Sequence, residues 1–159
     1  MDKEPKRTQD LLFDALLALL TRRSFDDICV TDICGRANVH RSTFYKYYVD
    51  KYELLEVQFQ GLIEQLFPGE DDLPRFLRHV AETPRLYKPL LLDPKNSEAE
   101  HIFRQRLALR LTELGFGEIA AQCRAGALLA AAAWWLRIEN RDVPSERLTE
   151  QLRPFFPLP

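Results

Sequence analysis

The sequence predicts an all-α protein. Apolar residues recur at intervals of three and four along most of the 159 residues, which is the spacing of one buried helix face. No segment shows sustained alternation of apolar and polar residues, so strands are not expected. Glycine, proline or asparagine interrupts the apolar pattern at lengths that suit globular helices. An apolar content of 46% and a charged content of 29% are typical of a globular protein.

The first expected helix is amphipathic. Leu12, Leu16 and Leu19 fall on one face, so the pattern predicts a helix from Thr8 to about Arg22. Ser24-Phe25-Asp26-Asp27 then forms a connector.

The next segment predicts two short helices joined by a turn. A helix is expected from about Val30 to Ala37, with Cys29 at the N-cap and Asp32 placed to reach back to it. Asn38 follows as a helix stop, because asparagine tolerates the left-handed conformation better than other non-glycine residues. A further short helix is expected from about Arg41 to Tyr47. This order is the layout of a helix-turn-helix, whose second helix enters the major groove of DNA.

The rest of the chain also reads as helices. Leu55, Phe59 and Leu66 share a face in a fourth helix that starts near Lys51 and ends at Pro68-Gly69. The later expected helices are Leu73 to Glu82, Arg85 to Leu92, one capped by Ser97 and reaching Leu114, Glu118 to about Glu139, and one from Pro144 limited by Pro154. We expect two domains, a DNA-binding head over residues 1–52 and a helical domain over residues 53–159.

Charge is distributed unevenly between these parts. The net charge of the chain is −2, but residues 36–51 carry four cations and one acid. Residues 53–159 carry 13 Lys and Arg against 16 Asp and Glu. A basic head on an acidic body is typical of a protein that meets DNA phosphates with one end only.

Candidate DNA contacts cluster around the third helix. Arg41 lies near its start, where arginine can pair with guanine, and His40 and Ser42 flank it. Phe44 and Tyr48 are four residues apart and are expected in the core. The candidates for phosphate contacts are Thr43, Tyr45, Lys46 and Lys51.

This region resembles the TetR family of regulators over about residues 8–60. The residues that carry the resemblance are Ile33-Cys34-Gly35-Arg36-Ala37-Asn38-Val39, His40, Arg41-Ser42, Thr43-Phe44-Tyr45, Lys46-Tyr47-Tyr48 and Lys51. The resemblance implies a homodimer that binds a palindromic operator in double-stranded DNA, usually as a repressor. It also implies a C-terminal helical domain that often binds a small effector, expected here to be apolar. The odd number of three cysteines argues against a disulfide framework and fits a reducing cytoplasm.

Four residues depart from the family pattern. Cys29 stands where a threonine usually caps the second helix and touches a phosphate, and Thr31 is the nearest hydroxyl that can replace it. Asn38 replaces a glycine, His40 replaces a serine or asparagine, and Tyr48 replaces a phenylalanine.

The C-terminal half resembles one branch of the family more weakly, through Gly126-Ala127-Leu128-Leu129 and Trp134-Trp135-Leu136. In that fold the last two long helices form a four-helix dimer interface. We expect small residues and at least one tryptophan there, since adjacent helix residues point about 100° apart. The interface set is Gly126, Ala130, Ala133, Trp134 and Trp135, and the pool for an effector pocket is Phe76, Tyr87, Phe103 and Cys123.

Other classes of protein find less support. The sequence has no glycine-rich phosphate loop and no His-Glu-x-x-His, so we expect no enzyme, cofactor or metal site. Cys29 and Cys34 lack a Cys-x-x-Cys spacing, although a redox sensor stays open. The longest uncharged apolar run, Ala125 to Leu136, is shorter than the about 20 residues that span a bilayer, so no membrane partner is expected. A protein-interaction module that keeps the fold without binding DNA or a small ligand is the remaining alternative.

Overall fold

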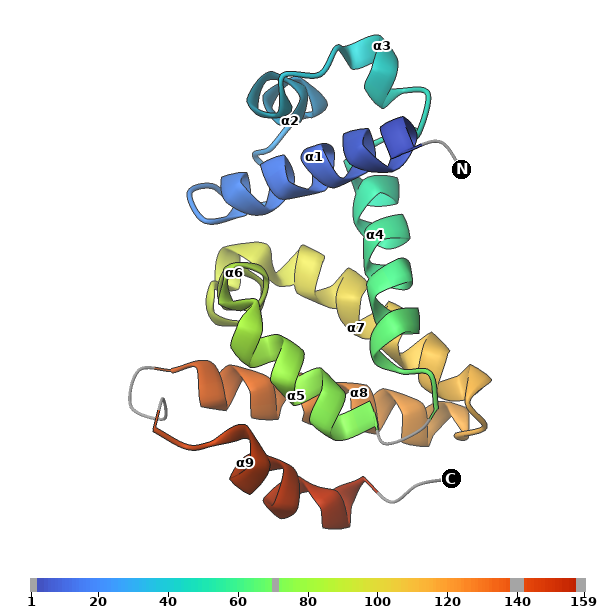
Figure 1. Cartoon of the computed structure of the whole chain (residues 1–159), viewed down its shortest axis with the longest axis vertical. Helices are drawn as coiled ribbons and strands as arrows, with labels where there is room; N and C mark the ends of the chain where they lie inside the picture. Colours follow the sequence, from blue (N-terminus) through green and yellow to red (C-terminus); the bar gives the residue numbers. More distant parts are fainter. Residues whose placement is uncertain (1–2, 70–71, 138–141, 157–159) are drawn as a thin grey trace.

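The computed structural model describes residues 3–69, 72–137 and 142–156, and all regular structure in these ranges is helical. Figure 1 shows the first helices of the chain gathered as a head at one end, from which the helix that starts at Lys51 leads to the remaining helices. The elements are α1 (Lys3–Leu20), α2 (Val30–Ala37), α3 (Arg41–Phe44), α4 (Lys51–Leu66), α5 (Asp72–Glu82), α6 (Pro84–Leu92), η1 (Pro94–Asn96), α7 (Ser97–Glu113), α8 (Glu118–Leu136), α9 (Ser145–Leu152) and η3 (Arg153–Phe155). The predicted all-α class is confirmed.

Several boundaries differ from the sequence prediction. Helix α1 starts at Lys3 rather than Thr8, and α3 ends at Phe44 because the chain continues in turns, with Tyr47 N bonding Phe44 O at 2.9 Å. Asn96, not Ser97, is the N-cap of α7. The predicted end of α8 near Glu139 falls outside the described residues, and α8 is assigned to Leu136.

The head packs around a small apolar core. Leu16 of α1, Ile33 of α2 and Phe44 of α3 are fully buried, and Tyr48 is buried beside Phe44. The prediction that Phe44 and Tyr48 belong to the core is therefore confirmed. Because these side chains point inward, the opposite face of α3 is left to solvent.

Helix α4 joins the head to the remaining helices. Its Phe59 lies between Phe13 of α1 and Phe103 of α7, with ring centroids 6.0 and 5.0 Å away. Glu56 of α4 also accepts a hydrogen bond from Arg106 of α7. The division into residues 1–52 and 53–159 stays a prediction, and α4 is the element that both parts share.

Helix α8 is long and apolar enough to cross a membrane by those two criteria alone, with 19 residues and a mean hydropathy of 1.3. In this fold its Ala125, Leu128 and Ala132 are buried in the common core. The helix thus contributes one face to the interior of the C-terminal bundle, and the expectation of no membrane partner stays a prediction.

Candidate nucleic-acid interface

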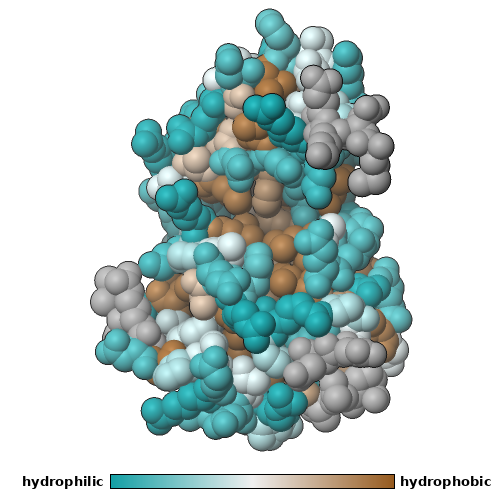
Figure 2. All heavy atoms as spheres, in the orientation of Figure 1, coloured by the Kyte–Doolittle hydropathy of each residue, from teal (hydrophilic) through white to brown (hydrophobic). Residues whose placement is uncertain are grey.

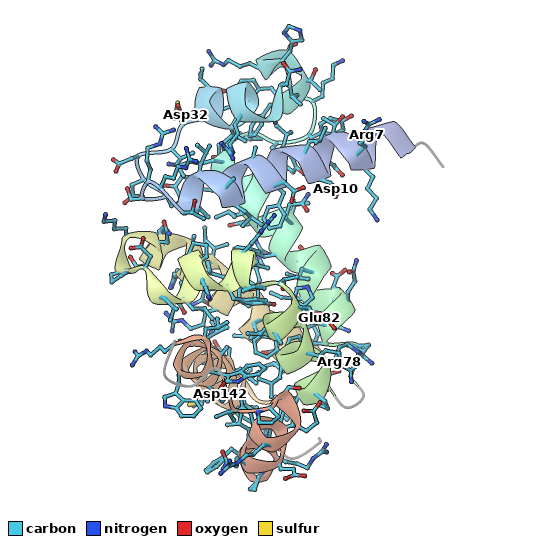
Figure 3. All side chains as sticks on the ribbon, turned by 60° about the vertical axis from the view of Figure 1, so that its left-hand side comes forward. Arg7, Asp10, Asp32, Arg78, Glu82 and Asp142 are labelled. Carbon is cyan, nitrogen blue, oxygen red and sulfur yellow. The ribbon has the colours of Figure 1, made fainter. Side chains whose placement is uncertain are left out.

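The start of α2 is fixed by an acidic residue three positions inside the helix. The Asp32 carboxylate accepts hydrogen bonds from the Cys29 backbone N–H at 2.9 Å and from its thiol at 3.0 Å. Arg23 lies 3.2 Å from the other carboxylate oxygen (Figure 3 labels Asp32). The two bonds from Cys29, followed by Arg23, lower the pKa of Asp32 to about 2. The predicted reach of Asp32 back to the N-cap is confirmed.

The turn after α2 depends on Asn38. Its φ of 54° and ψ of 45° place it in the left-handed region. No other non-glycine residue among those that the structure describes has a positive φ. The Val39 N–H then bonds to Cys34 O at 3.0 Å, which closes the end of α2. The predicted helix stop is confirmed, and it sets the angle at which the chain enters α3.

Helix α3 presents a polar, basic face to solvent. His40, Arg41 and Ser42 are exposed at its start, Thr43 is half-buried, and Lys46 is exposed just beyond its end. The Arg41 guanidinium lies 5.9 Å from the ring centroid of Tyr45, and a hydrogen bond between these side chains raises the pKa of Arg41. Arg41 is therefore a permanent cation braced by an exposed aromatic ring.

Two further cations lie on the helices next to α3 in the chain, Arg36 on α2 and Lys51 on α4, and they differ in their exposure. Arg36, exposed at the end of α2, was not among the predicted contacts, although its place in the basic segment points to it. Thr31 is exposed in the first turn of α2. Six predicted contacts have the exposure that DNA binding requires, namely Thr31, His40, Arg41, Ser42, Tyr45 and Lys46.

Lys51 has a different position from the one expected of a phosphate contact. Its Nζ donates to the backbone oxygens of Phe25 at 2.7 Å, Asp26 at 3.1 Å and Ile28 at 2.8 Å. An ammonium has three N–H donors, so all of them have acceptors within the protein. The Phe25 ring lies beneath the same ammonium at 4.6 Å. We therefore assign Lys51 to holding the α1–α2 connector.

Three of the four residues in the predicted effector pool lie in the core. Phe76, Tyr87 and Phe103 are fully buried, and Tyr87 contacts both rings at centroid distances of 5.9 and 6.0 Å. Cys123 is exposed on α8. The three aromatic members of the pool thus pack through Tyr87 in the core, and Cys123 lies on the exposed side of α8.

The described residues do line two open grooves. The larger, of about 1050 Å³, runs between α1 and α4 on one side and the α5–α6 junction on the other. Figure 2 shows apolar side chains in the band below α1. Phe13, Leu17 and Leu62 contribute to the lining, together with the acidic Asp10 and Glu82 that Figure 3 labels. The smaller groove, of about 670 Å³, lies between the α6–α7 junction and α8.

His79 borders the larger groove and is coupled to the core. Its Nδ1 lies 2.9 Å from the Tyr87 hydroxyl. Burial raises the pKa of Tyr87, so this hydroxyl keeps its proton and a neutral His79 accepts from it. Burial also lowers the pKa of His79 below its ordinary value of 6.5, with nearby Glu82 opposing the shift.

Stability should consequently fall in mild acid. The unfolded chain takes up a proton on His79 at higher pH than the folded protein does, so the stabilisation is complete above about pH 6.5 and is lost as pH falls through the lowered folded pKa. We expect the melting temperature of wild type to fall between pH 7.5 and pH 5.5, and that of His79→Gln to fall by less over the same range. His101→Gln, at an exposed position on α7, is the control and should follow wild type. An identical pH profile for His79→Gln and wild type would contradict this reading.

The two adjacent tryptophans point in different directions. Trp135 is 8% exposed, and its Nε1 donates to Val143 O at 2.7 Å within the same chain. Trp134 is 45% exposed. The hydrogen bond and the burial of Trp135 place it in the C-terminal bundle of this chain, and the interface role of the two tryptophans stays a prediction. Of the small residues predicted there, Ala130 is exposed and Gly126 and Ala133 are half-buried, and all three line the smaller groove.

In the part of the chain that the structure describes, the cysteines form neither a disulfide nor a metal site. Cys34 is buried, and this burial raises the pKa of its thiol, which disfavours the reactive thiolate. Cys29 is exposed but bonded to Asp32. Within residues 3–69, 72–137 and 142–156, no group of three or more His, Cys, Asp and Glu is arranged around a common metal position.

Comparison with known proteins gives the same fold. Residues 12–57 match the family model described as bacterial regulatory proteins of the tetR family. The dhaKLM operon activator DhaS of Lactococcus lactis is 28% identical over 103 residues, and the match covers 60% of this chain and 54% of DhaS, about half of that relative. The crystal structure of a TetR regulator from Streptococcus agalactiae superposes with a TM-score of 0.65 at 25% identity, covering 94% of this chain and 93% of the other. NalD, a Pseudomonas aeruginosa repressor, superposes with a TM-score of 0.57 at 17% identity, covering 93% and 96%.

A helix-turn-helix head whose second helix exposes basic side chains, carried on a helical body, defines a class of bacterial regulatory protein. Over residues 12–57 the chain matches the TetR family within that class, and its fold as a whole is similar to that of a TetR regulator. Members of this family are DNA-binding transcriptional regulators and not enzymes.

Proposed function

We propose that this protein binds a palindromic operator in double-stranded DNA as a cytoplasmic homodimer and represses transcription from it. The observation that carries the proposal is the exposed face of α3, where Arg41 stands braced by Tyr45 between His40 and Ser42. The sign of regulation varies among similar proteins, since DhaS is an activator and NalD a repressor.

Within this proposal, Arg41 reads bases and the exposed Lys46 contacts phosphates. Thr31 and Arg36, exposed on α2, are placed on the helix that crosses the backbone in this motif. Lys51 is left out of the phosphate set, because its three donors already have carbonyl acceptors.

The test is a binding titration on DNA selected by the wild-type protein. Arg41→Ala should cost about 1–3 kcal/mol and relax the base preference at one position of each half-site. Lys46→Ala should weaken binding to all sequences alike and reduce the salt slope by about one. If wild type selects no DNA, or if neither variant differs from it, the alternative of a TetR-fold interaction module replaces this proposal.

Dimerisation follows from what one head can read. A single α3 of four residues touches few bases, whereas two heads about 34–36 Å apart reach successive major grooves. The outward face of α8 supports this, because it exposes two large apolar side chains, Ile119 at 81% and Trp134 at 45%.

We expect Trp134→Ala to weaken the dimer. Aromatic anchors at interface centres are worth about 2 kcal/mol or more, which corresponds to roughly 30-fold in the dissociation constant. Light scattering against dilution measures the change. Phe155→Ala, at a position 71% exposed, is the control and should dimerise as wild type does. A Trp134→Ala protein with an unchanged dissociation constant would remove α8 from the interface.

A small apolar effector is the last part of the proposal. The predicted pool of Phe76, Tyr87 and Phe103 is closed by ring packing, so we place the effector in the larger groove, where Phe13 and Leu17 of the head meet the α5–α6 junction. A bound molecule there touches the DNA-binding head directly. If no compound in a broad screen releases the protein from its operator, the effector is withdrawn and operator binding stands.

A further inference from the structure

The connector between α1 and α2, residues 21–29, is held by a side chain from η1, far from it in the sequence. Asn96 of η1 is fully buried, with 0% of its surface exposed. Its Oδ1 accepts from the Phe25 N–H at 3.2 Å, and its Nδ2 donates to Leu20 O at 3.1 Å and to Pro89 O at 3.0 Å. One amide thus bonds to two residues of the head and one residue of α6.

These bonds satisfy groups that the helices leave open. Leu20 is the last residue of α1, and Pro89 lies in the last turn of α6, where backbone oxygens have no partner further along the helix. Asn96 therefore caps the carboxyl ends of both helices at once. An apolar residue at this position would leave two carbonyls and one N–H buried without partners, which is costly.

Lys51 completes the arrangement from the opposite side. It bonds the oxygens of Phe25, Asp26 and Ile28, so that Phe25 is fixed through its N–H by Asn96 and through its C=O by Lys51. The Phe25 ring is itself buried and meets Tyr52 edge to face at 5.1 Å. Two residues after Ile28 the chain enters α2, so the place of α2 follows from the place of Phe25.

The segment that carries Asn96 also forms one wall of the smaller groove. Asp93, Pro94 and Ser97 line that groove, and Ala130 and Ala133 of α8 line the opposite wall. A shift of α8 against the α6–α7 junction therefore acts on the residues on both sides of Asn96.

We propose that Asn96 is a positioning residue that latches the DNA-binding head to the α6–α7 junction, so that movement of the C-terminal helices reaches α2 and α3 through the α1–α2 connector. The consequence for DNA rests on the proposed function. The latch itself is a property of the free protein and is testable without DNA.

Hydrogen exchange resolved by residue on the wild-type protein is the first test. The Phe25 amide donates to Asn96, so it should open together with the amides of α6 and α7 and not with a separate opening of the head. Should Phe25 and the α2 amides exchange at least about tenfold faster than those of α6 and α7, the head moves independently and the latch is overturned.

The second test compares Asn96→Ala with Gln122→Ala. Gln122 also loses an amide hydrogen bond, at 3.3 Å to Gln105, but this bond lies wholly between α8 and α7. In Asn96→Ala the amides of Phe25 and α2 should exchange about tenfold or more faster, while those of α8 keep their wild-type rates. Equal acceleration along the whole chain, or no acceleration at the connector, overturns the latch. If Asn96→Ala does not fold, the wild-type exchange pattern decides.

Operator binding provides the functional readout. Asn96→Ala should bind the selected operator about tenfold more weakly, with an unchanged salt slope because no phosphate contact is lost. Gln122→Ala should bind as wild type does. Wild-type affinity in Asn96→Ala would overturn the functional role of the latch. Failure of the wild-type protein itself to bind any DNA would instead count against the proposed function, and the exchange results would still decide the latch.

Discussion

Replacing Lys51 by methionine should destabilise the protein by about 2–4 kcal/mol, because several carbonyls lose a charged donor that water replaces only in part. The Lys51 ammonium bonds the backbone oxygens of Phe25, Asp26 and Ile28, and methionine keeps the length of the stem without any donor. For a chain of this size the loss corresponds to roughly 4–16 °C in melting temperature. Urea unfolding followed by circular dichroism measures the loss of free energy, and thermal unfolding measures the fall in melting temperature.

Lys46→Met provides the matched control. Lys46 is an exposed lysine of the same head, so its substitution should change stability by no more than about 0.5 kcal/mol. The effects on DNA binding should be the reverse. In Lys46→Met the slope of log affinity against log salt concentration should fall by about one, whereas folded Lys51→Met should keep the wild-type slope. If instead Lys51→Met melts with wild type and loses the slope, Lys51 is a phosphate contact as its place in the sequence predicted.

The sequence predicted well those features that neighbouring residues determine. Asp32 reaches Cys29 across three positions, and Asn38 adopts its left-handed conformation at the end of the same helix. Both depend on local backbone geometry, which residue type and spacing indicate directly. The apolar periodicity likewise predicted the helices, with errors mainly at their ends.

Features that depend on distant residues were not predictable in this way. The oxygens that hold Lys51 lie 23 to 26 residues earlier in the chain, and Asn96 bonds to groups 71 and 76 residues away. Nothing in the local pattern distinguishes such a lysine from a phosphate contact, or such an asparagine from a surface cap. The convergence exists only after α1, α4 and α6 have packed.

The tryptophan pair shows a related limit. Helical geometry predicted that Trp134 and Trp135 point in different directions, but which of the two points inward depends on the packing of α8. Trp135 found an acceptor in Val143 O and turned inward, whereas Trp134 remained 45% exposed. Similarly, Phe76, Tyr87 and Phe103 are of the types that line pockets, and contact among their rings places them in the core.

Phe59→Ala should destabilise the protein by about 3–5 kcal/mol, more than Lys51→Met does, and this is a large fraction of the total for a domain of ordinary stability. Phe59 is fully buried on α4, and its ring meets Phe13 of the head and Phe103 of α7 edge to face. Truncation removes both aromatic contacts and leaves a cavity at the point where the head and the C-terminal helices meet. Because the same cavity weakens both sides, the head and the C-terminal helices should lose stability together.

Two probes test this expectation in one unfolding experiment. Both tryptophans of the chain lie in α8, so their fluorescence reports the C-terminal helices, whereas circular dichroism reports the whole chain. In Phe59→Ala both signals should shift together by roughly 6–20 °C. Phe155→Ala removes the same atoms from a side chain 71% exposed and should shift neither by more than about 2 °C. The opposite outcome is a tryptophan transition at its wild-type temperature together with a circular dichroism transition at a lower temperature. It would mean that Phe59 stabilises the head alone. The coupling between the head and the C-terminal helices would then run chiefly through other contacts, such as those of Asn96.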